Sequence, residues 1–238
     1  MKGVLCLWIM FVFALHVGAM DFAKESSYQN ACDGGDGQSC LKLGAMYHSG
    51  DGVGQSFSHA KELYIDACDI NVSEACLNLG FMYGSGQLGT DYPKAMAYYQ
   101  KACSLGNAKG CASLALLYEN GQGVETNLEE AVNYYDKACD GNDGGSCAHL
   151  GLMYENSENY VDAAIYYQRA CDAGEAKECS TLGMFYYTGQ GVEQNEEKAS
   201  KFFKKACEMG DESGCKNEEI VKKQIEVNEK EVEKIDTL

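Results

Sequence analysis

The sequence predicts an all-α protein, built as a solenoid of two-helix repeats that are stapled by disulfides. Twelve of the 13 cysteines form six pairs with a separation of eight residues, and successive pairs follow at intervals of 32 to 36 residues. Every full interval repeats the same two apolar patterns. A period of this length is typical of helical-repeat arrays, in which each repeat packs against its neighbours and no single large core is needed.

Residues 1–19 have the composition of a secretory signal peptide. Lys2 precedes the apolar run Val4–Val17, and Val17-Gly18-Ala19 supplies small residues for cleavage. An uncleaved membrane anchor is the alternative, but the run is shorter than the roughly 20 residues of a transmembrane helix. Cleavage removes Cys6 and leaves an even number of cysteines, which predicts a disulfide framework in an exported protein, periplasmic or secreted.

The mature chain then divides into three parts. Residues 20–39 are expected to form an N-terminal half-unit and first turn, residues 40–214 five αα repeats, and residues 215–238 a C-terminal capping helix. In each repeat, Cys, Leu, Gly or Ala, and Tyr at offsets 0, 3, 4 and 7 occupy one face of a first helix. A second helix ends in a close variant of Ala-x-x-Tyr-Tyr-x-x-Ala-Cys, whose aromatic residues we expect to pack against the first helix.

Two kinds of turn separate the helices. A Gly-x-Gly-Val segment is predicted to join the two helices of a repeat; it has a looser form at Gly86–Gly89 in the second repeat and is missing from the fourth between Tyr154 and Ala163. Between repeats, Gly or Asn stands three residues after the first cysteine of every pair. These residue types tolerate the left-handed conformation that ends helices.

Each cysteine pair therefore spans the turn between consecutive repeats, and we expect it to form a disulfide. The alternative, zinc binding, requires close Cys-x-x-Cys ligand pairs, which this sequence lacks, so neither a metal nor a cofactor is expected. The predicted pairs are Cys32–Cys40, Cys68–Cys76, Cys103–Cys111, Cys139–Cys147, Cys171–Cys179 and Cys207–Cys215.

These motifs closely resemble Sel1-like repeats, which are relatives of tetratricopeptide repeats, from about Cys32 to Cys215. The exported, disulfide-paired version is similar to the Helicobacter cysteine-rich protein family. The resemblance implies a right-handed superhelix with a concave and a convex face. It also implies penicillin binding or weak β-lactamase activity, a hydrolase reaction on cyclic amides, whereas other Sel1-type proteins are adaptors for protein partners.

The residues themselves do not identify a catalytic site. Ser-x-x-Lys occurs at Ser39, Ser58 and Ser213, but Ser-Asp-Asn and Lys-Thr-Gly, which complete the serine β-lactamase set, are absent. The histidines are scattered, so a zinc hydrolase has no ligand cluster, and His149 is expected at the surface. The enzymatic hypothesis therefore depends on the resemblance alone, and the catalytic residues stay unknown.

A binding face is predicted on the first helices of the repeats. Offsets 1, 5 and 8 from the second cysteine lie away from the Leu/Tyr packing stripe, and the candidates stand at offset 5 and at offsets 8 and 9. An apolar floor edged by Asn, Glu and Tyr suits an extended peptide, although the offset-5 residues could instead pack against the neighbouring repeat. The candidate residues are Phe81, Leu116, Leu152, Met184, Glu119, Asn120, Glu155, Asn156 and Tyr187.

The formal net charge of −17 argues against nucleic acid and anionic membranes as partners. Three functions remain open. The protein could bind a peptide or protein segment; it could bind a β-lactam or peptidoglycan fragment with slow hydrolysis; or it could be a non-catalytic secreted scaffold in host contact or envelope assembly. A monomer without membrane insertion after signal cleavage is expected.

Overall fold

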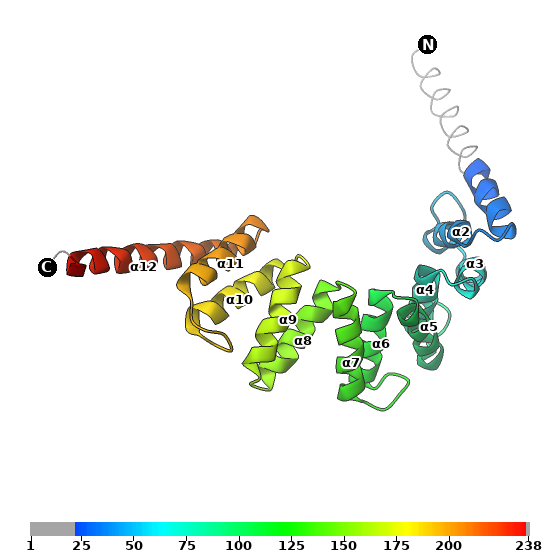
Figure 1. The fold of residues 1–238 in the computed structure, drawn as a ribbon. Helices are drawn as coiled ribbons and strands as arrows, with labels where there is room; N and C mark the ends of the chain where they lie inside the picture. The colour runs from blue at the N-terminus through cyan, green and yellow to red at the C-terminus, as the bar shows by residue number, and fades with distance from the viewer. Residues whose placement is uncertain (1–21, 237–238) are drawn as a thin grey trace, which may run out of the picture. The chain divides into compact units, whose positions relative to one another are not determined.

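The computed structural model describes residues 22–236, and every regular element in that range is a helix (Figure 1). The predicted all-α class is therefore confirmed. No helix within these residues is long and apolar enough to cross a membrane. The predicted signal peptide, residues 1–19, lies outside the described residues. The chain divides into two compact units between Thr126 and Asn127.

The first unit contains a helix at residues 22–33 and five further helices, which follow one another as antiparallel neighbours. These are α2 (Gly37–Ser49), α3 (Phe57–Asp69), α4 (Ser73–Gly84), α5 (Tyr92–Ser104) and α6 (Ala108–Asn120). The second unit contains α7 (Leu128–Asp140), α8 (Gly144–Asn156), α9 (Tyr160–Asp172), α10 (Ala176–Thr188), α11 (Glu196–Glu208) and α12 (Glu212–Asp236).

Short polar side chains fix where most of these helices begin. Asp91, for example, accepts a hydrogen bond from the backbone N–H of Lys94, and Asn127 accepts one from Glu130. Such caps satisfy backbone donors that have no partner inside the helix. The other capping residues are Asp36, Ser56, Asn107, Asp143, Asn159 and Asn195.

Six disulfides close the turns between repeats, at the six pairs that the spacing predicts. The paired Cα atoms lie 4.6–4.9 Å apart, within the range that a disulfide spans. The residue three positions after each first cysteine has a positive φ angle, 66° at Asn71 and 63° at Asn142. Glycine occupies this position at the other four turns, at Gly35, Gly106, Gly174 and Gly210.

The small residue at offset 4 brings the two helices of a repeat together. A Cβ atom on Gly80 would lie 2.5 Å from the ring of Tyr99, and one on Gly151 would lie 2.6 Å from the ring of Tyr167. Both rings are buried. The predicted packing role of the recurrent aromatic residues is thus confirmed at these positions.

Gly80→Val is expected to destabilise the protein by about 1–3 kcal/mol, because the ring of Tyr99 must move to admit the side chain. Chemical denaturation followed by circular dichroism measures this loss. Gly54→Val is the matched control, since a Cβ there meets nothing within 4 Å. Equal stability of the two variants would contradict the close-packing account.

The other aromatic position stacks on the offset-7 tyrosine of the first helix. Tyr83 and Tyr98 have ring centroids 5.7 Å apart, and Tyr154 and Tyr166 have theirs 5.3 Å apart. Tyr186 and Phe202 form the same stacked arrangement. The second, fourth and fifth repeats therefore each have a buried aromatic ring against the glycine and, beside it, a half-buried stacked pair.

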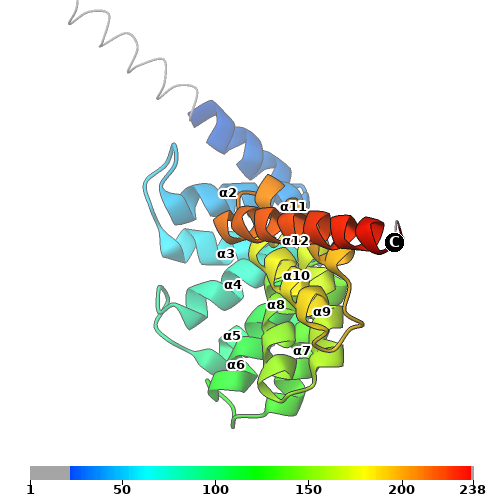
Figure 2. The same cartoon turned by 90° about the vertical axis from the view of Figure 1, so that its left-hand side faces the viewer.

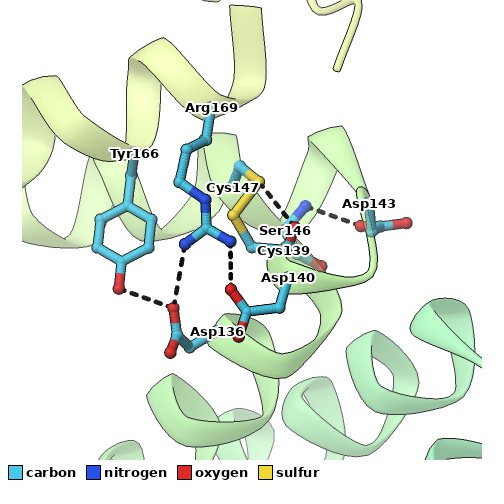
Figure 3. The surroundings of a disulfide bond; sticks show 8 residues. All are labelled: Asp136, Cys139, Asp140, Asp143, Ser146, Cys147, Tyr166 and Arg169. Carbon is cyan, nitrogen blue, oxygen red and sulfur yellow. Dashed lines mark hydrogen bonds and ion pairs between the residues drawn. A yellow bond between two sulfur atoms is a disulfide. The ribbon is translucent and has the colours of Figure 1, made fainter. Parts of the chain in front are cut away.

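Ion pairs link the second helices of successive repeats on the face that these helices expose. Arg169 of α9 reaches Asp140 at 2.5 Å and Asp136 at 3.5 Å, while the hydroxyl of Tyr166 donates to Asp136 at 2.8 Å (Figure 3). Lys101 contacts Asp69 in the first unit, and Lys205 contacts Asp172 in the second. These pairs lie partly in solvent and fix alignment more than they add stability.

The fourth repeat and the C-terminus depart from the common pattern. Only three residues, 157–159, separate α8 from α9, and Glu158 adopts a left-handed φ of 60° in this tight turn. At the end of the chain, α12 packs against α10 and α11 (Figure 2). Val221 is buried against Ala199 and Phe203, with Ile225 beside it, whereas Ile220 is exposed.

Candidate binding site

The apolar floor of the predicted binding face is exposed to solvent. Phe81, Leu116, Leu152 and Met184 are between 41% and 51% exposed. About half of each side chain is therefore open to a ligand, and the other half is covered by its own and neighbouring helices. Phe81 and Leu116 belong to the first unit and Leu152 and Met184 to the second, and exposed apolar side chains of this kind can cover an apolar surface of a ligand.

The polar residues of the predicted face have different surroundings. Asn120 is exposed and its side chain donates to the carbonyl of Leu116 in its own helix, while Asn156 is exposed at the end of α8. Glu119 is half-buried. Tyr187 packs against the cluster around Phe203 and Val221, so part of its ring belongs to the core next to α12.

A cavity of about 480 Å³ opens between α8 and α10 in the second unit. It brings together two residues that the sequence places on the binding face, Leu152 and Glu155, with the buried Tyr167 of α9. The remaining lining residues are Gly145, Ala148, His149, Lys177, Glu178 and Thr181. A concave site with an apolar wall and a few polar groups is the form that ligand sites take in proteins.

The two acidic residues of this cavity, Glu155 and Glu178, both affect the hydroxyl group of Tyr167. Its hydroxyl donates to Glu155 Oε2 at 2.5 Å. Burial, this hydrogen bond, and the negative charges of Glu155 and Glu178 all raise the pKa of Tyr167 well above its usual value. The phenol therefore stays neutral at physiological pH and holds one carboxylate oxygen of Glu155 in place.

Sequence reasoning did not assign some residues of this cavity. His149, expected at the surface, is half-buried, and its ring centroid lies 4.5 Å from that of Tyr135. The sequence pattern predicts Tyr167 only as a packing residue and gives Lys177 no role in a site. The sequence does mark Glu178 as unusual, because the residue before the second cysteine is Ser, Ala or Gly in every other pair.

The three Ser-x-x-Lys serines have structural partners. The hydroxyl of Ser39 donates to Asp36, that of Ser213 donates to Asp211, and that of Ser58 lies 3.1 Å from the hydroxyl of Ser56. All three lie in or next to helix N-termini, where short polar residues cap the chain. Among residues 22–236, no group of three or more His, Cys, Asp and Glu side chains is arranged to hold a metal ion.

The fold and the repeated cysteine turns define a helical-repeat protein of the kind that mediates protein interactions. The sequence profile of the Sel1 repeat matches residues 37–71, 73–107, 108–143, 145–175 and 181–211. These segments make up most of the chain, so it belongs to the Sel1 repeat family. A search of curated proteins found no match.

Solved structures of Sel1 repeat proteins resemble this chain. A Sel1 repeat protein from Oxalobacter formigenes is 27% identical with a TM-score of 0.65, and the match covers 76% of each chain. The protective antigen c5321 of uropathogenic Escherichia coli is 26% identical with a TM-score of 0.64, over 84% of this chain and 52% of the antigen. Cysteine-rich protein B of Helicobacter pylori is 30% identical over 68% and 93% of the two chains, with a TM-score of only 0.31.

Proposed function

We propose that this Sel1 repeat protein is an exported scaffold that binds an extended segment of a partner protein along its first helices. The observation that carries the proposal is the cavity between α8 and α10, which contains Leu152 and Glu155 of the predicted face. A partner side chain seated there would anchor a segment that also contacts the exposed apolar residues of the same unit, Leu152 and Met184. Repeat arrays commonly use such extended surfaces for binding.

The disulfides support a site of action outside the cytosol. Structural disulfides persist in the periplasm and in secreted proteins, whereas cytosolic reductants keep thiols reduced. All twelve cysteines in the described residues are paired. The apolar N-terminal run and small-residue cleavage site agree with this location. We also propose that the chain is a cysteine-rich member of its family, supported by two cysteines in every repeat.

Alanine at Phe81, Leu116, Leu152 and Met184 together tests the proposal. A partner captured from periplasmic and secreted fractions, identified by mass spectrometry and then purified, is expected to lose about tenfold or more in affinity, because four apolar contacts disappear. Titration calorimetry measures the change. The matched control carries alanine at Ile70, Leu128, Val161 and Ile165, which are exposed apolar residues outside the predicted face. Equal affinity of both variants for the partner would refute the binding face.

The β-lactam hypothesis makes a separate prediction. Because Ser39, Ser58 and Ser213 lie at helix N-termini among capping groups, we expect purified protein to show no turnover of a chromogenic cephalosporin. A spectrophotometric assay measures this directly. Turnover that disappears in one Ser→Ala variant would instead establish a serine hydrolase.

A further inference from the structure

We propose that the cavity between α8 and α10 binds a cationic side chain, arginine or lysine, of the partner segment. This inference rests on the proposed function and specifies the chemistry of the partner at its anchor point. The cavity, its two carboxylates and its apolar wall lie within the second unit and come from three helices, α8, α9 and α10.

Both carboxylates line the cavity together with one buried phenol, that of Tyr167. Glu155 comes from the last turn of α8 and Glu178 from the first turn of α10. Tyr167, only 4% exposed, donates to Glu155 Oε2, and the charges of both glutamates act on its hydroxyl. Within the described residues, Glu155 Oε1 has no protein hydrogen-bond partner, and neither glutamate forms an ion pair. A guanidinium or ammonium group between the two carboxylates would supply that partner.

The rest of the cavity suits the stem of a long basic side chain. Leu152 is 48% exposed, and Ala148 lies one turn before it on α8. Lysine and arginine bury their methylene groups on such apolar surface while the charged end reaches a polar group. Lys177 also lines the cavity, but it is exposed, and its neighbour Glu178 is half-buried. The strongly negative chain favours the approach of a cation over that of an anion.

Glu155 and Glu178 do not belong to the set of residues that recurs in every repeat. The position of Glu155 is taken by His48, Gly84 and Tyr187 in the first, second and fifth repeats, and by a second glutamate, Glu119, in the third, where Ser146 stands at the position of Glu178. Glu178 replaces a Ser, Ala or Gly found before the second cysteine elsewhere. Positions that build the fold recur in every repeat, whereas this pair occurs once. The pair is therefore not needed for the repeat fold.

The test uses the oxidised mature chain and two capped amino acids as probes. N-acetyl-arginine methylamide is expected to shift backbone NMR signals of Leu152, Glu155, Tyr167 and Glu178 as it is titrated. The isosteric but neutral N-acetyl-citrulline methylamide is expected to bind about tenfold more weakly, because it cannot form charge-assisted hydrogen bonds.

The double variant Glu155→Gln/Glu178→Gln is expected to weaken arginine binding about tenfold or more while keeping an acceptor for Tyr167. The control Glu125→Gln/Glu193→Gln removes the same two charges from exposed loop positions outside the cavity and is expected to bind as the parent does. Unchanged affinity of the first variant, equal binding of citrulline, or shifts confined to other residues would overturn the inference.

The captured partner distinguishes this inference from the proposed function. Suppose that the partner binds the four-alanine variant more weakly but binds Glu155→Gln/Glu178→Gln as tightly as the parent. That result would support the scaffold function and refute the cation-binding cavity. If the four-alanine variant kept full affinity, the binding face itself would be wrong.

Discussion

Reduction of the six disulfides is expected to unfold the protein under conditions in which the oxidised form stays folded. Each bridge closes a loop between cysteines eight residues apart. The chain-entropy model assigns about 2–3 kcal/mol to a loop this short, or roughly 15 kcal/mol for six. That sum is comparable with the whole net stability of a typical domain, about 5–15 kcal/mol. Far-ultraviolet circular dichroism with and without dithiothreitol measures the loss of helix.

A single-pair variant provides the graded control. Cys68→Ala/Cys76→Ala is expected to lower the free energy of unfolding by about 2–3 kcal/mol while leaving the other five bridges intact. If the reduced protein kept its helical circular dichroism signal and still unfolded cooperatively on heating, packing alone would hold the repeats together. A free thiol detected by mass spectrometry at any of the twelve described cysteines would contradict the six-bridge arrangement.

Leu79→Ala is expected to destabilise the protein by about 2–5 kcal/mol. Leu79 is fully buried in α4 and belongs to the offset-3 column, whose members pack between the helices of each repeat. Truncation leaves a cavity that the disulfide-linked helices cannot collapse to fill. The other members of the column, Leu43, Leu114, Leu150 and Leu182, are equally buried.

Phe81→Ala, two residues along the same helix, is the matched control. Phe81 is 51% exposed, so its truncation is expected to change the free energy of unfolding by less than about 0.5 kcal/mol. Chemical denaturation of the three proteins in parallel measures both effects. A similar loss in both variants would mean that α4 has its core face assigned wrongly.

Local chemistry made the fold predictable from the sequence. The Cys, Leu, Gly and Tyr columns report helix faces directly, because a side chain returns to the same face every three or four residues. Asn71 and Asn142 likewise revealed left-handed turn positions, since few residue types tolerate that conformation. The spacing of eight then identified the disulfide partners without any knowledge of long-range contacts.

Only some of the residues that line the cavity could be predicted from the sequence. Leu152 and Glu155 could be placed on a face from their own helix, but Glu178 and Tyr167 reach the cavity from α10 and α9. Which side chains meet there depends on how consecutive repeats stack, and no periodicity within one repeat encodes that stacking. Tyr187 shows the converse, because its position in the helix assigns it to the binding face, whereas contact with the cluster around Val221 buries part of its side chain.

The placement of the bridges also bears on how the chain matures. A cysteine and its partner lie within nine consecutive residues, so in the exported chain proposed above both would emerge from a translocation channel almost together. Closing so short a loop takes well under a microsecond, whereas oxidation is far slower, so each thiol samples its native partner many times before it reacts. Distant pairings cost more chain entropy. Vectorial translocation would therefore favour native pairing from the first repeat to the last, with little need for a disulfide isomerase.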